Sequence, residues 1–125
     1  MTTPTILYLS HGGGPLPLLG DAGHREMVST LNAITAQIQK PSVILVISAH
    51  WEEEKPTVTS GAFPALIYDY YGFPPHTYEV TYPAPGAPAL AERTADLIAA
   101  AGLPTKLDET QGYDHGTFVP MEILW

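Results

Sequence analysis

Cysteine is absent from this 125-residue sequence, and basic residues are scarce. Without cysteine the chain forms no disulfide and offers no thiolate ligand, which suits a reducing compartment. Only five Lys and Arg stand against 13 Asp and Glu, so the net charge is −8. Because nucleic-acid backbones and anionic membrane surfaces are bound through basic side chains, we expect neither nucleic acid nor membrane as a partner.

Long apolar runs are also missing. No stretch approaches the roughly 20 apolar residues that a membrane helix requires, and the N-terminus lacks a basic segment leading into an apolar one. We therefore expect a cytoplasmic protein. Hydrophobic residues still make up 45% of the sequence, enough for a packed core, and the length suits one domain. Residues 1–125 are thus interpreted as a single domain.

Short apolar runs alternate with helical patterns, which predicts an α/β fold. Residues 5–9 and 43–47 are continuous apolar runs typical of buried strands. Residues 25–39 between them repeat apolar side chains at helical spacing, so a right-handed crossover would make the two strands parallel neighbours. A second helix and two short strands are predicted over residues 88–101, 56–60 and 105–107. We expect a mostly parallel or mixed sheet flanked by helices in three layers.

The segment 63–85 is rich in aromatic residues and proline. It holds five tyrosines, two phenylalanines and five prolines, with little helical period. Such a composition predicts a long ordered loop, and long loops inside compact domains are commonly functional. Its rings either form an aromatic core or line a pocket for a flat ring.

Three of the five histidines follow a short apolar run or lie in a glycine-flanked turn. His11 and His50 each follow a predicted strand and a serine, and carboxyl ends of parallel strands gather ligands. Imidazole is the commonest metal ligand among side chains and the usual acid or base near neutral pH. The repeated pattern favours a functional role for these two histidines. His115, in a glycine-flanked turn, is equally consistent with a functional residue and with an ordinary turn residue, and His24 and His76 lack this setting.

Five motifs occur in an order that resembles a known family. They are SHGGGP at residues 10–15, SAHW at 48–51, YYGFP at 70–74, YPAPG at 82–86 and YDHGTFVP at 113–120. Together they resemble the class III extradiol ring-cleavage dioxygenases of the LigB-like superfamily, in the branch of DOPA 4,5-dioxygenase-like proteins. The resemblance runs from near residue 5 to the last residue.

The resemblance implies a non-haem metal centre, with Fe(II) for ring cleavage and Zn(II) in some relatives. His11 matches the first metal-ligand histidine of the family, and His50 matches the second. His115 matches a histidine near the substrate that binds or protonates the catecholate. Neutral imidazoles hold a divalent ion and leave open positions for other ligands. The implied activity is extradiol opening of a catechol ring with O2, and the resemblance assigns no further substrate-binding residue.

Two alternatives use the same histidines. Members of the family continue past the last motif and supply further ligands there, so we expect residues 1–125 to lack the C-terminal half of the domain. A zinc-dependent hydrolase is one alternative, and a non-catalytic metal-binding half-domain that needs a partner chain is the other. The apolar residues 121–125 favour cover by further sequence or by a homo- or hetero-oligomer, because large apolar side chains need a surface to pack against.

Overall fold

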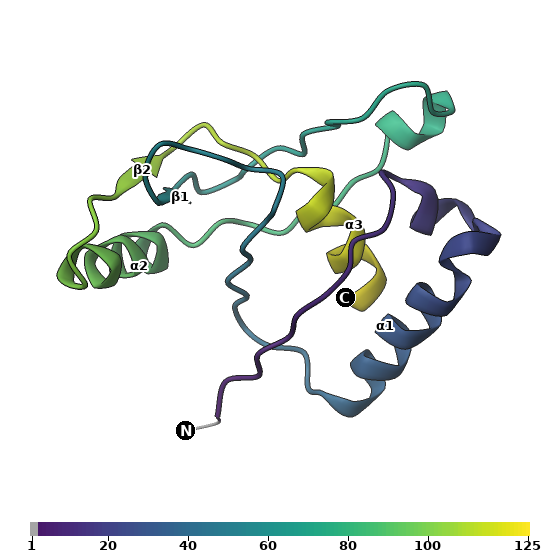
Figure 1. Cartoon of the computed structure of the whole chain (residues 1–125), viewed down its shortest axis with the longest axis horizontal. Helices are drawn as coiled ribbons and strands as arrows, with labels where there is room; N and C mark the ends of the chain where they lie inside the picture. Colours follow the sequence, from purple (N-terminus) through teal and green to yellow (C-terminus); the bar gives the residue numbers. More distant parts are fainter. Residues whose placement is uncertain (1–2) are drawn as a thin grey trace.

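The computed structural model describes residues 3–125, which form three α-helices, three short 3-10 helices and a two-stranded sheet (Figure 1). In chain order the elements are η1 (Leu16–Leu19), η2 (Ala22–His24), α1 (Arg25–Gln37), β1 (Thr57–Thr59), η3 (Pro75–Tyr78), α2 (Pro88–Ala100), β2 (Lys106–Asp108) and α3 (His115–Leu124). The strands are parallel, with Val58 opposite Leu107. The predicted α/β class is therefore confirmed.

Helices α1 and α3 pack against each other and form the main core. Leu31 of α1 and Met121 and Leu124 of α3 are buried together. The Thr35 hydroxyl also donates a hydrogen bond of 3.0 Å to the Leu124 carbonyl, one of the carbonyls that a helix end leaves without a partner. Helix α1 therefore covers much of the apolar segment 121–125 within the chain itself.

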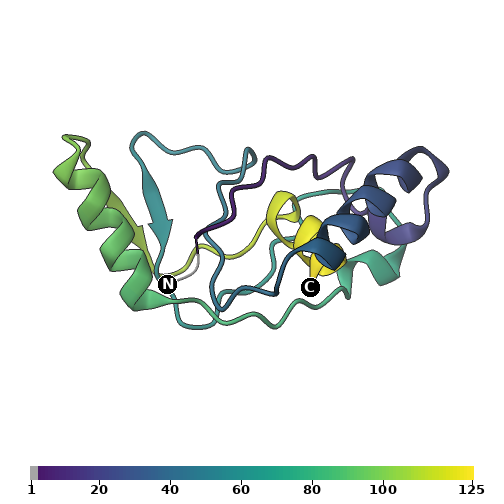
Figure 2. The same cartoon turned by 90° about the horizontal axis from the view of Figure 1, so that it is seen from below.

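The sheet and α2 form a second, smaller unit. Ala91 and Ala95 are the buried residues of α2, and their small side chains let the helix lie close to the sheet. Figure 2 shows this unit at one end of an elongated molecule and α1 and α3 at the other. The predicted helix over residues 88–101 is confirmed, with Pro88 at its start and Gly102 (φ +92°) directly after its C-cap.

The two strands predicted over residues 5–9 and 43–47 are not present. Both segments are irregular, and neither has backbone hydrogen bonds to a neighbouring strand within the described residues. Without such a ladder an apolar run is not a strand, however strong its β propensity. The predicted parallel pair of residues 5–9 and 43–47 is therefore wrong for residues 3–125, and the parallel sheet consists of the predicted short strands near residues 57 and 106 instead.

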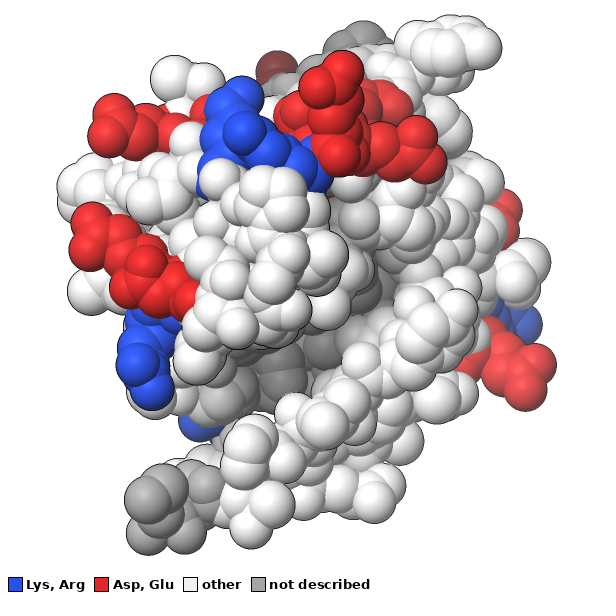
Figure 3. All heavy atoms as spheres, turned by 60° about the vertical axis from the view of Figure 1, so that its left-hand side comes forward, with Lys and Arg blue, Asp and Glu red and all other residues white. Residues whose placement is uncertain are grey.

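An open hollow of about 1620 Å³ lies beside the segment 43–47. Its walls include Ile44, Val46 and Tyr82 together with Leu90 and Ile98 of α2. Figure 3 shows a hollowed face whose inner walls are largely uncharged, with most charged side chains on its outer rim.

Helix α3 is an α-helix that the sequence pattern does not predict. It contains Gly116 and Pro120, two residues that disfavour a helix interior. Burial of six of its ten residues, against α1 and against the aromatic segment 63–85, compensates for both. No helix in the part of the chain described here has the length and apolar character needed to cross a bilayer.

Candidate metal centre

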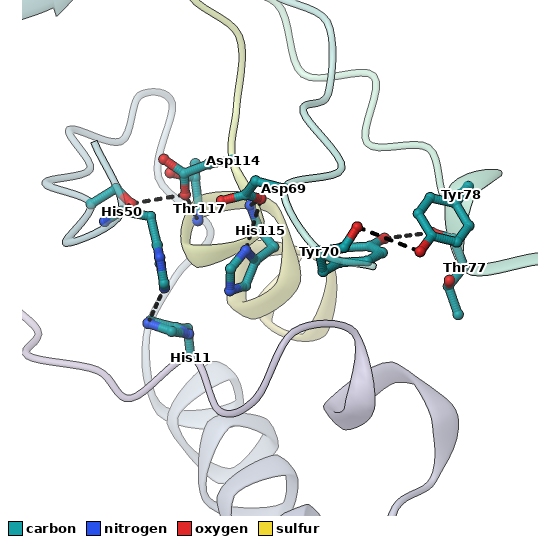
Figure 4. A network of polar contacts seen from close by, with 10 residues as sticks. His11, His50, Asp69, Tyr70, Thr77, Tyr78, Asp114, His115 and Thr117 are labelled. Carbon is teal, nitrogen blue, oxygen red and sulfur yellow. Dashed lines mark hydrogen bonds and ion pairs between the residues drawn. The ribbon is translucent and has the colours of Figure 1, made fainter. Parts of the chain in front are cut away.

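Three histidines from distant parts of the chain meet at one point (Figure 4). One ligand nitrogen from each of His11, His50 and His115 lies within 4.8 Å of the others. The Nε2 atoms of His11 and His50 are 2.9 Å apart, and the ring centroids of His50 and His115 are 4.1 Å apart. The structure therefore brings together all three candidates from the sequence, although loops and the start of α3, rather than adjacent strands, position them.

Ser48 and Asp114 connect the His50 loop to the start of α3. The Ser48 hydroxyl donates to Asp114 Oδ1 at 2.8 Å and accepts the His50 backbone N–H at 3.2 Å. Asp114 is also the N-cap of α3, where Oδ1 accepts the Thr117 N–H at 3.1 Å. A capping carboxylate satisfies an orphan amide and lies at the positive end of the helix dipole. This connection fixes His50 relative to His115.

Gly116 leaves room for His50. A Cβ atom at this position would lie 2.8 Å from His50 Cδ2 and 2.9 Å from Ser48 Oγ, both closer than ordinary contacts. The motif Asp114-His115-Gly116 thus caps the helix, presents an imidazole and makes space for a second one.

His24 shapes the glycine loop that follows His11. Its Nδ1 donates to Asp21 at 2.7 Å, so its Nε2 accepts the Gly13 N–H at 3.0 Å. Gly12 has φ +73°, and a Cβ there would lie 2.6 Å from His24 Cδ2. His24 is not among the site residues predicted from the sequence. The spacing of Asp21 and His24 by three residues is the signal that would have identified the pair.

Asp69 is a second residue that the sequence reasoning missed. One of its oxygens, Oδ1, accepts two hydrogen bonds from His115, from the ring Nδ1 at 2.7 Å and from the backbone N–H at 2.9 Å. Burial acts to raise the pKa of Asp69, but the hydrogen bonds that its carboxylate accepts from His115 outweigh burial, so the pKa of Asp69 lies below its usual value. The two residues are 46 positions apart, and no spacing rule connects them.

The aromatic segment packs as a core next to His115. The hydroxyl groups of Tyr68 and Tyr70 donate to the backbone carbonyls of Val80 and Thr77, and both rings pack against the fully buried Phe118. The ring centroid of Tyr70 lies 5.9 Å from that of His115. Burial raises the pKa of Tyr70, which keeps its hydroxyl a donor. Of the two sequence-based interpretations, the contacts favour the aromatic core.

The histidine cluster has the chemistry of a site for a divalent transition metal. Burial lowers the pKa of His11, and the nearby His50 and His115 lower it further, so its ring is held neutral. In the structure the Nε2 atoms of His11 and His50 face each other, and only one of them can donate to the other. A cation between them would use both lone pairs, and three imidazoles form a typical donor set for iron or zinc. The residues therefore fit a metal ion.

A cluster of three histidine side chains on a small α/β scaffold is typical of a candidate non-haem metal site. The chain belongs to the family described as the catalytic LigB subunit of aromatic ring-opening dioxygenase, whose model matches residues 4–125. This membership confirms the family resemblance of the five motifs.

Curated relatives agree with the family match. A protein named dioxygenase tasH from Hapsidospora irregularis is 46% identical over 127 residues, covering 95% of this chain and 39% of its own length. Proteins named 4,5-DOPA dioxygenase extradiol from Beta vulgaris and Escherichia coli (strain K12) are 44% and 39% identical, with 94% of this chain covered in each case. The chain spans 44% and 41% of these two relatives, less than half their length.

Proposed function

We propose that this chain carries part of the active site of an extradiol dioxygenase that opens a catechol ring with O2. The observation that carries the proposal is the convergence of His11, His50 and His115 in a chain of the LigB family. The names of the relatives, which include dioxygenase and 4,5-DOPA dioxygenase extradiol, support the same reaction class.

In this proposal His11 and His50 hold the metal ion, Fe(II) for ring cleavage or Zn(II) in a non-oxidative relative. A bound metal would supply a Lewis acid with open positions for the substrate and O2. His115 acts as the acid and base: its ring lies beside both ligands and is mostly buried, where it can hold or deliver a proton for a catechol hydroxyl.

Metal retention tests the two ligands. We expect His50→Ala to weaken binding of Fe(II) or Zn(II) at least about tenfold, because losing a ligand removes more than the loss of an outer-shell contact. His76→Ala is the matched control, since His76 is exposed on η3 away from the cluster. Metal content after dialysis, measured by mass spectrometry, should fall only in the first variant. Equal metal content in both variants would refute the ligand assignment.

The reaction is tested by O2 uptake. The chain is loaded anaerobically with Fe(II), given an alkyl-substituted catechol, and exposed to labelled O2. One O2 should be consumed per ring opened, with both oxygen atoms in the product, because extradiol cleavage needs no other reductant. Iron binding without O2 uptake would favour the non-catalytic half-domain, and zinc-dependent hydrolysis of an ester without O2 uptake would favour the hydrolase.

A further inference from the structure

We propose that Asp69 positions His115 by holding its ring in the tautomer with the proton on Nδ1, so that Nε2 is the nitrogen available to the centre. This inference rests on the proposed function, in which His115 acts on the substrate. The inference gives Asp69 a role and assigns His115 one of its two neutral tautomers.

The contacts of Asp69 leave His115 one orientation. Its Oδ1 accepts both the ring Nδ1–H at 2.7 Å and the backbone N–H at 2.9 Å of the same residue. The backbone N–H of His115 is the first of α3, one of the donors that a helix cannot satisfy internally. Because both bonds end on one oxygen, the ring is fixed relative to its own backbone. The side chain of His115 is only 8% exposed, so water has little access to compete for Nδ1.

The tautomer follows from the donor and acceptor inventory. An ionised carboxylate only accepts hydrogen bonds, and a neutral imidazole carries one N–H. The short Nδ1 contact therefore places the proton on Nδ1 and leaves the lone pair on Nε2. Figure 4 shows the second ring nitrogen turned away from Asp69, on the side of His11 and His50.

A carboxylate also suits a ring that gains a proton during the reaction. When Nε2 takes a proton from a catechol hydroxyl, the ring becomes an imidazolium with Nδ1–H still bound to Asp69. A nearby negative charge stabilises this cation, as the buried aspartate does in serine protease triads. Asp69 acts on the centre through its hydrogen bonds to His115, so its role is positioning.

The tautomer can be read directly in the metal-free chain. With ¹⁵N-labelled histidine, long-range ¹H–¹⁵N spectra distinguish a protonated from an unprotonated nitrogen at each ring position. In the wild-type protein we expect His115 to be almost entirely in the Nδ1–H form at pH 8. An Nε2–H form there would overturn the proposal, and this measurement needs no variant.

Variants separate positioning from folding. Asp69→Ala removes the acceptor and should change the ratio of the two His115 tautomers at least about tenfold, since a hydrogen bond to a charged group is lost. Asp69→Asn keeps an acceptor oxygen and should retain the Nδ1–H form. Asp21→Asn is the matched control, because Asp21 makes an equally short contact to His24 instead. An unchanged His115 tautomer in a folded Asp69→Ala protein would contradict the inference.

The outcome is independent of whether the chain is a dioxygenase. If the chain binds iron but consumes no O2, the proposed function fails while the tautomer result stands. If O2 uptake is observed but His115 carries its proton on Nε2, the reaction class stands and the role of Asp69 is wrong.

Discussion

The segment 43–50 combines exposed apolar side chains with a residue that is held in place by hydrogen bonds. Ile47 is 92% exposed, whereas the next residue, Ser48, is tied by hydrogen bonds to Asp114 and to the backbone of His50. Val46 packs on the α1–α3 core, and its neighbour Leu45 is 69% exposed. One side of this apolar run is therefore covered and the other is not.

The same contrast appears at the N-terminal segment. Leu9 packs on the core, while Ile6 and Tyr8 are exposed. By comparison, His11, two residues after Leu9, has a partly buried ring in contact with two others. The difference shows that the residues around His11 and His50 are held by contacts within the chain, whereas many side chains of the two apolar segments that precede them stay exposed.

The largest expected effect is the difference in stability between a substitution at a buried residue and one in the exposed apolar run. Phe118→Ala removes a fully buried ring that packs against Tyr68 and Tyr70, and it should lower the free energy of unfolding by about 3–5 kcal/mol. Ile47→Ala, its matched control in the exposed run, should change it by no more than about 0.5 kcal/mol. Urea denaturation followed by circular dichroism measures both. Similar losses in the two variants would show that residues 43–47 are covered in solution.

A smaller loss of stability is expected at Gly116, where the start of α3 contacts the loop that carries His50. Gly116→Ala should destabilise the protein by about 1–3 kcal/mol, because the new Cβ would lie 2.8 Å from His50 Cδ2 and the site must shift. The same substitution should also weaken metal binding by displacing His50.

Gly13→Ala is the control for Gly116→Ala. A Cβ at Gly13 would meet its nearest neighbour, Leu16 Cδ1, at 3.5 Å, which is an ordinary contact. This variant should keep both stability and metal affinity close to wild type. Calorimetric metal titration compares the metal affinities of the two variants. Equal affinities would mean that the glycine after His115 has no steric role.

Sequence patterns predicted what depends on local periodicity. The helices near residues 25–37 and 88–100 follow from apolar spacing and from Pro88 and Gly102. The meeting of His11 and His50 was expected from a repeated pattern, and it occurs even though the strands invoked to explain it are absent. A strand requires a partner in space, and an apolar run does not reveal whether that partner is present.

The parts that could not be predicted depend on contacts between distant residues. Helix α3 forms despite Pro120 because α1 and the aromatic segment bury most of its residues. Asp69 reaches His115 across 46 positions, and the link between Ser48 and Asp114 spans 66 positions. Such pairs follow from the fold and carry no periodic signal, so the supporting residues of the centre were missed while its histidines were found.

The smallest expected effect concerns the turn that leads from β2 toward the histidine end. The carboxylate of Asp108 accepts hydrogen bonds from the Thr110 N–H, the Thr110 hydroxyl and the Gln111 N–H, and these lower its pKa. A lowered folded-state pKa contributes stability above the unfolded value of about 3.9 and loses it as the pH falls through the folded value. Wild type should therefore lose stability in acid more steeply than Asp108→Asn, and the stabilities of the two proteins should converge once Asp108 is protonated.

Asp96→Asn, at an exposed position of α2, is the control. Urea midpoints between about pH 2 and pH 7 test this, and a constant difference between wild type and Asp108→Asn across that range would show that the turn does not depend on the charge.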